Sequence, residues 1–146
     1  MNRPANAPLW LRLAALLYDL LVLVAIWMVA AALVLLAFRG EVDVAHQPPL
    51  YHAVLQLVLL VLTALYFAVS WSRGGQTIGM RAWRVRLMDA TGGSLTFRRA
   101  LLRFGLATLS LLIVGAGFIW SLFDAERRAW HDVVLGTRML RVARQG

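Results

Sequence analysis

The chain has 146 residues, of which 61% are hydrophobic and 15% are charged, with a mean hydropathy of +0.72. Soluble domains carry about 45–50% apolar and about 25% charged residues, so these values argue against a soluble enzyme, a disordered tail and a small secreted module. The absence of cysteine excludes disulfides and thiolate sites. The net charge is +8, and the chain contains arginine but no lysine. In a chain with such apolar runs, this charge indicates contact with anionic lipid head groups.

Three stretches without any charged residue predict membrane helices: Leu20–Phe38, Leu50–Ser72 and Phe104–Phe123. At about 1.5 Å per residue, each is long enough for a hydrocarbon core of about 30 Å. The first helix is expected to begin earlier, so the predicted segments are 9–38, 50–72 and 104–123. We therefore predict an all-α membrane protein with one domain, 1–146, built as a small bundle of three hydrophobic helical segments.

The long connection from Arg73 to Arg103 predicts a short cytoplasmic β-hairpin over residues 80–97. The stretch Ala82–Asp89 partly alternates apolar and polar residues, Thr91–Ser94 is typical of a turn, and Leu95–Phe97 is short and apolar. The C-terminal tail, residues 124–146, contains a second strand-like stretch that starts at Thr137.

The distribution of arginine predicts the orientation in the membrane. The second connection holds seven arginines and the first holds one, which places the second connection and the N-terminus in the cytoplasm of a multi-pass inner-membrane protein. The tail holds five more, although three full crossings would place it outside. The third segment therefore either crosses fully or bends at Gly115–Gly117 and returns, and the tail arginines favour the return.

Arg12 and Asp19 stand inside the first predicted helix, where a charge costs at least about 2.5–3.5 kcal/mol. They share a helix face but lie about 10 Å apart along the axis, so each is expected to find its partner elsewhere. For Asp19 we expect an arginine of the second connection or a hydroxyl such as Thr108 or Ser110. Asp19 is then either a hydrogen-bonded contact between helices or the titrating group of an ion or proton relay.

Three motifs, in order, resemble those of the RDD family of small bacterial membrane proteins, named for one Arg and two Asp. Residues 12–19 resemble its Arg-x-x-Ala-x-x-x-Asp opening, and residues 75–81 its Gly-Gln-Thr-x-Gly-Lys-Arg segment, with Met80 in place of the usual Lys. Residues 127–137 resemble its closing Arg-x-x-x-His-Asp-x-x-x-Gly-Thr. The supporting motif residues are Gly75, Gln76, Thr77, Gly79, Arg81, His131, Gly136 and Thr137.

The resemblance implies that Arg12, Asp19 and Asp132 are the three naming charges, with functional or structural roles. If the third segment returns, Asp132 reaches the cytoplasmic end of the first helix, and we predict a charge-assisted pair between Arg12 and Asp132. The tail strand Thr137–Val142 could then pair with Ala82–Asp89. The family has no assigned molecular role, and the resemblance suggests transport.

Two functions follow as expectations. The first is transport of a small ion or solute by a homo-oligomer, because three segments leave little room for a path. The alternative is a non-transporting scaffold or accessory subunit that docks a membrane or cytoplasmic protein through its arginine-rich face. We expect the lipid bilayer and anionic lipid head groups as partners and no nucleic acid. We expect no enzyme activity, no cofactor and no metal site.

Overall fold

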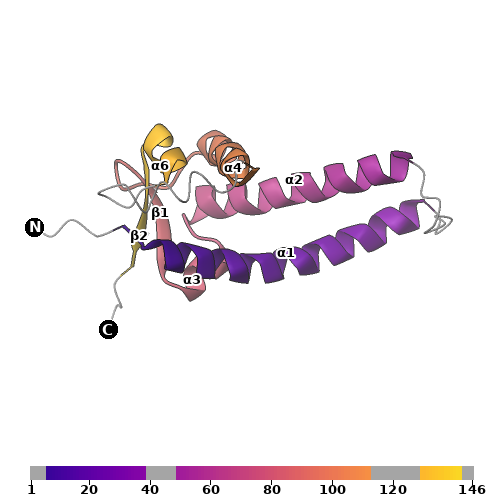
Figure 1. The fold of residues 1–146 in the computed structure, drawn as a ribbon, viewed down its shortest axis with the longest axis horizontal. Coiled ribbons are helices and arrows are strands. Elements are labelled where there is room, and N and C mark those ends of the chain that lie inside the picture. The colour runs from indigo at the N-terminus through magenta and orange to yellow at the C-terminus, as the bar shows by residue number, and fades with distance from the viewer. Residues whose placement is uncertain (1–5, 39–48, 113–128, 143–146) are drawn as a thin grey trace, which may run out of the picture.

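The computed structural model describes residues 6–38, 49–112 and 129–142, and the structural statements below refer to these residues. Its longest elements are α1 (Leu9–Ala37) and α2 (Pro49–Arg73), which lie side by side as a hairpin (Figure 1). Both are long and apolar enough to cross a membrane, and only 17% and 11% of their most apolar windows are buried. A core helix of a soluble protein would be mostly buried, so these exposed apolar surfaces favour contact with lipid.

The remaining elements gather where α1 begins and α2 ends (Figure 1). They are α3 (Ile78–Ala82), β1 (Val85–Asp89), α4 (Phe97–Leu112), α6 (Trp130–Leu135) and β2 (Thr137–Arg141). We call residues 74–95 and 129–142, which carry α3, β1, α6 and β2, the head of the molecule.

The head is held together by a two-stranded sheet. Strands β1 and β2 are antiparallel, with Val85 opposite Arg141 and Asp89 opposite Thr137. The chain before α1 joins the same sheet, because the Ala7 N–H donates to the Met139 carbonyl at 2.7 Å. The start of α1, the connection after α2 and the tail strand therefore lie at one end of the helical hairpin.

Helix α4 packs against α2 and crosses the hairpin. Figure 1 shows it nearly end-on, whereas α1 and α2 lie lengthwise. The rings of Phe67 on α2 and Phe104 on α4 stack with centroids 5.9 Å apart. Helix α4 buries Ala100, Arg103 and Ser110 on one face, so it places a charged side chain inside the molecule.

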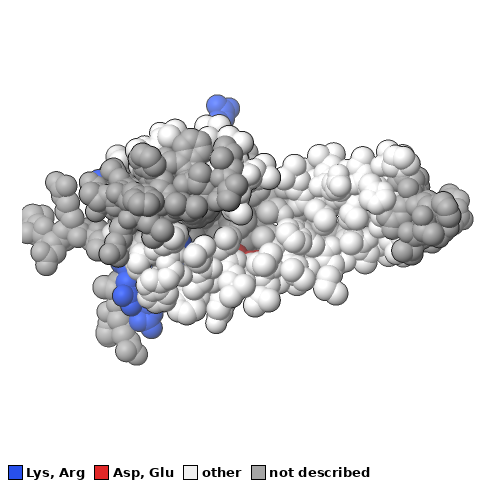
Figure 2. Space-filling model, viewed as in Figure 1, with Lys and Arg blue, Asp and Glu red and all other residues white. Residues whose placement is uncertain are grey.

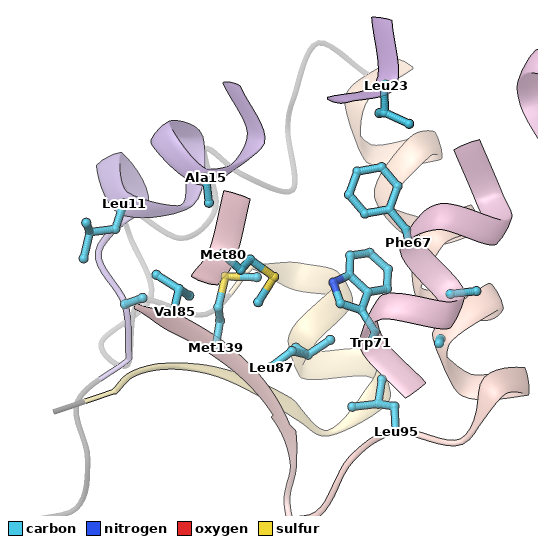
Figure 3. Close-up of a cluster of buried hydrophobic side chains, with 13 residues drawn as sticks. Leu11, Ala15, Leu23, Phe67, Trp71, Met80, Val85, Leu87, Leu95 and Met139 are labelled. Atoms are coloured by element: carbon cyan, nitrogen blue, oxygen red, sulfur yellow. The ribbon is translucent and has the colours of Figure 1, made fainter. Parts of the chain in front are cut away.

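The hydrophobic core lies where the helical hairpin meets the sheet (Figure 3). Val85 and Leu87 on β1 are fully buried, as the alternation of a half-buried strand requires. Trp71 and Phe67 of α2 and Met139 of β2 belong to the same buried cluster. The core thus fixes the head to the ends of α1 and α2.

The predicted hairpin over 80–97 is wrong, although its first strand is present. The described partner of β1 is β2, which confirms the predicted pairing of the tail strand. Leu95 is instead buried in the core, and Phe97 begins α4, whose Arg99 N–H donates to the Thr96 hydroxyl at 3.5 Å. A hydroxyl at that position caps a helix, and this signal outweighs the weak strand propensity of three residues.

The described residues contain the first part of the third predicted segment, as helix α4. Helix α4 begins at Phe97 rather than Phe104. Arg103 is buried and paired with Asp132, so this charge lies within the helix and does not mark its start. Within the described ranges, two helices are long and apolar enough to cross a membrane, not three. Residues 113–128, and with them the bend predicted at Gly115–Gly117, lie outside the described residues.

Candidate functional site

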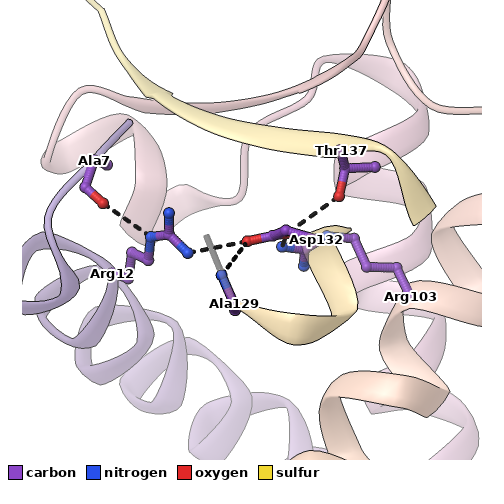
Figure 4. Close-up of polar contacts among 6 residues, drawn as sticks. All are labelled: Ala7, Arg12, Arg103, Ala129, Asp132 and Thr137. Atoms are coloured by element: carbon purple, nitrogen blue, oxygen red, sulfur yellow. Dashed lines mark hydrogen bonds and ion pairs between the residues drawn. The ribbon is translucent and has the colours of Figure 1, made fainter. Parts of the chain in front are cut away.

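Asp132 lies at the centre of a buried ion cluster (Figure 4). Arg12 Nη1 donates to its Oδ2 at 3.0 Å, and Arg103 Nη2 donates to its Oδ1 at 2.5 Å. All three side chains are at most 4% exposed. The Thr137 hydroxyl donates to Oδ1 at 3.1 Å. A buried carboxylate is tolerated when it is both paired and hydrogen-bonded, and Asp132 meets both conditions.

The local fold of the tail places Asp132 in this position. Asp132 lies in the first turn of α6, and its Oδ2 also accepts from the Ala129 N–H at 3.4 Å, as an acidic residue at a helix start does. Helix α6 ends at Gly136, whose φ of 62° is in the left-handed region that favours glycine. The chain then turns into β2, so Thr137 meets the carboxylate five residues before it.

Arg12 is held from a second side, because its Nε donates to the Ala7 carbonyl at 3.0 Å. The ion cluster therefore joins four parts of the chain: the segment before α1, α1 itself, α4 and the tail. Removing one partner of such a cluster is expensive, because it leaves the remaining charge buried.

Asp19 is the second buried carboxylate, with 2% of its surface exposed. It accepts three hydrogen bonds, from the Tyr66 hydroxyl at 2.7 Å, the Thr77 hydroxyl at 2.5 Å and the Gly79 N–H at 2.8 Å. The donors come from α2 and from the start of α3. Asp19 therefore connects α1 to both of these helices, and it does so through neutral groups.

Two of these donors, the hydroxyls of Thr77 and Tyr66, also accept hydrogen bonds from backbone N–H groups of α3. The Thr77 hydroxyl accepts from the Met80 N–H at 3.1 Å, and the Tyr66 hydroxyl accepts from the Ile78 N–H at 3.3 Å. The first N–H groups of a helix have no partner within the helix. Asp19 thus accepts directly from the Gly79 N–H. It also binds the two hydroxyls that accept from the N–H groups of Ile78 and Met80, so all three N–H groups in the first turn of α3 have a partner.

Gly79 is required by the close approach of α3 to α1. A Cβ at this position would lie 2.0 Å from the Ala15 carbonyl oxygen and 2.9 Å from the Asp19 carboxylate. Only a residue without a side chain lets α3 sit on this carboxylate.

Gly75 and Gln76 tie the end of α2 to β1. The Gly75 carbonyl accepts from the Leu87 N–H at 2.7 Å, and Gly75 has a φ of 66°. The Gln76 amide donates to the Val85 carbonyl at 2.9 Å. Arg81, by contrast, is exposed on α3.

A cavity of about 120 Å³ lies between α1, α2 and α4, next to both carboxylate networks. Arg12, Asp19 and Arg103 form its charged wall, and the guanidinium of Arg103 lies 4.7 Å from the centre of the Trp71 ring. Most of the other lining side chains are apolar or aromatic. A concave site with a few polar groups in an apolar wall is the usual form of a small-molecule site.

The model of the RDD family matches residues 6–136. The chain belongs to the RDD family. No curated protein and no solved structure matches it. The match includes Arg12, Asp19 and Asp132, the charges around which both networks of this RDD protein are built.

The predicted pair between Arg12 and Asp132 is present, but the sequence reasoning missed Arg103. Arg103 follows two leucines and precedes Phe104, and a charge in such an apolar setting was itself a signal that it needs a buried partner. In the motif of residues 75–81, Thr77 and Gly79 donate hydrogen bonds to Asp19. In the closing motif, Gly136 forms the turn after α6 and Thr137 donates to Asp132.

The prediction that a hydroxyl donates to Asp19 is confirmed, but the two named hydroxyls and the alternative of an arginine are wrong. Ser110 is buried elsewhere on α4 and Thr108 lines the cavity, while the described donors are Tyr66, Thr77 and Gly79. His131 lies in α6, but its side chain is outside the described set. Among residues 6–38, 49–112 and 129–142, no group of three His, Asp or Glu could hold a metal ion.

Proposed function

We propose that this RDD protein is a multi-pass inner-membrane protein that supports transport of a small ion or solute. The cavity beside Arg12, Asp19 and Arg103 carries the proposal, because it lies between two helices of membrane length. Charged side chains in membrane segments generally face a protein interior or a cavity and mark the paths of ions and solutes. A volume of about 120 Å³ admits several water molecules or a small solute.

The arginines support a cytoplasmic position for the head. Exposed arginines lie at this end of the molecule. Figure 2 shows basic side chains there, and in that view the described residues over the outer part of the helical hairpin are not basic. Arginine is enriched in cytoplasmic connections. The start of α1 and the tail strand share this end with the second connection, so the N-terminus, the second connection and the tail are proposed to be cytoplasmic.

Transport requires an oligomer in this proposal. The two helices of membrane length line only part of the cavity and expose apolar side chains along most of their length. A second copy of the chain would extend the cavity into a path across the membrane.

The hydrogen bonds of Asp19 favour a fixed role over a mobile one. A relay in which Asp19 exchanges protons freely would have to break bonds from Tyr66, Thr77 and Gly79. We therefore propose that Asp19 holds the cavity wall in shape and that the solute enters the cavity without displacing α3.

Flux into proteoliposomes tests the function, with a panel of Na⁺, K⁺, H⁺, Cl⁻ and small organic anions. Ala107→Phe fills the cavity from α4, and Leu109→Phe adds the same ring at an exposed position of the same helix. We expect flux above empty vesicles for the wild type and Leu109→Phe, and loss of flux for Ala107→Phe. No flux for any member of the panel would overturn the proposal.

The exposed arginines favour one second candidate, a scaffold that docks an acidic membrane or cytoplasmic protein. Arg84 on the turn before β1 and Arg141 on β2 are both exposed on the head. A stable co-purifying partner that is lost in Arg84→Ser or Arg141→Ser, but kept in Ala107→Phe, would support docking instead of transport.

A further inference from the structure

Two buried N–H donors beside the cavity have no acceptor among the described residues. They are Nε of Arg103 and the ring nitrogen of Trp71, on side chains of residues that are 2% and 5% exposed. Both residues line the cavity. Figure 3 shows the Trp71 ring nitrogen pointing toward Met80 and Met139, which line the same space.

Buried donors are nearly always hydrogen-bonded. Two buried donors at one cavity, without a partner in the described part of the chain, therefore indicate a ligand in the cavity that supplies the acceptor atoms. The protein's own nearby carboxylates are already engaged. Asp132 is shared by Arg12 and Arg103, and the two oxygens of Asp19 accept three bonds from neutral groups. The polar side of the cavity therefore offers donors and guanidinium charge.

The remaining wall indicates the other half of the ligand. The apolar part of the wall includes Leu16, Phe67, Phe104 and Leu111. Helices α1 and α2, which bear the first two, also expose apolar side chains outside the cavity. A cavity of about 120 Å³ holds a small head group and the first carbons of a chain, but not a whole lipid.

We propose that the cavity binds the anionic head group, carboxylate or phosphate, of a membrane amphiphile whose chain continues along the apolar wall. Arg103 and Trp71 donate to its anionic oxygens. The proposal names the ligand class of the cavity, and it rests on the proposed function only in taking this cavity as a binding site.

The test measures retention of radiolabelled dodecanoate by the full-length protein in phosphatidylcholine nanodiscs, after subtraction of retention by empty nanodiscs. Trp71→Phe removes the N–H and keeps an aromatic ring, and Arg103→Lys keeps the charge without the guanidinium. Trp10→Phe and Arg98→Lys are matched controls, because both residues are exposed and Arg98 lies on the same helix as Arg103.

We expect saturable binding that weakens about tenfold or more in Trp71→Phe and Arg103→Lys, the loss expected for a hydrogen bond to a charged group. The two controls should change affinity by about twofold or less. Dodecanol, which lacks the charge, should compete at least about tenfold more weakly than dodecanoate. If Arg103→Lys does not fold, Trp71→Phe still decides the outcome.

Three results would overturn the proposal: no saturable binding, equal loss in the controls, or competition by acetate or inorganic phosphate as strong as that by dodecanoate. The last result would assign the site to a soluble anion. Flux without saturable dodecanoate binding would refute the ligand class alone, whereas binding without flux would refute transport alone.

Discussion

Replacing Gly79 by alanine tests the docking of α3 on the first membrane helix. The added Cβ would lie 2.0 Å from the Ala15 carbonyl oxygen, whereas ordinary contacts begin at about 3.4 Å, so α3 must retreat by more than 1 Å. A retreat of that size takes the 2.8 Å bond between the Gly79 N–H and Asp19 out of hydrogen-bonding range.

The size of the effect follows from the bonds that are lost. Each hydrogen bond to a charged group contributes about 1.5–3 kcal/mol, and the shift of α3 also disturbs the bond from Thr77. We expect Gly79→Ala to lower the free energy of unfolding by about 2–5 kcal/mol. Gly105→Ala is the control, because its Cβ meets nothing within 4 Å and alanine favours a helix by about 0.5–1 kcal/mol.

The assay is unfolding of the purified protein in detergent, followed by circular dichroism. A Gly79→Ala protein as stable as the wild type would refute the argument, because α3 could then not be seated against Ala15 and Asp19. A loss of equal size in Gly105→Ala would show that the assay responds to any added methyl group.

Further predictions use the same unfolding assay, apart from the last. Asp132→Asn removes the charge that Arg12 and Arg103 share and should cost about 3–5 kcal/mol; wild-type stability would deny the cluster. Tyr66→Phe removes one of three donors to Asp19 and should cost about 1–3 kcal/mol, and an unchanged value would contradict that bond. Gly136→Ala should cost about 1–2 kcal/mol from backbone strain at a φ of 62°, and no loss would contradict the left-handed turn. A cytoplasmic reporter fused at the C-terminus should be active, and one active only outside would place the tail on the other face.

The helical hairpin could be predicted from the sequence, because charge-free runs of this length that lack a two-residue alternation are stable in lipid only as helices. The pairing of the tail strand with β1 could be predicted from the cost of leaving Asp132 and Arg12 unpaired. The alternation in Ala82–Asp89 by itself predicts a strand but not its partner, so the sequence also predicts a local hairpin over 80–97. The turn at Gly136 brings a distant segment of the tail to the sheet and decides between the two.

Two of the donors to Asp19, Thr77 and Gly79, could not be predicted, because their positions depend on a five-residue helix that no periodic pattern reveals. The Thr77 hydroxyl and the Gly79 N–H can be identified as donors only when the start of this helix is known to lie beside α1. Arg103 was missed for a different reason. Its apolar neighbours indicate a need for a buried partner, but a charge near the start of an apolar run is equally typical of an interfacial residue. The position of Asp132 decides between the two.

The central structural claim is that one buried ion cluster joins the start of α1 to the tail. The most direct test is a double-mutant cycle on Arg12→Ala and Asp132→Ala, with the free energy of unfolding as the measured quantity. A cycle on Arg99 and Asp89, whose side chains are 39% and 18% exposed, serves as the control and should give a coupling of about 0–1 kcal/mol. We predict a coupling of at least about 1.5 kcal/mol between Arg12 and Asp132. Strictly additive losses would contradict the claim.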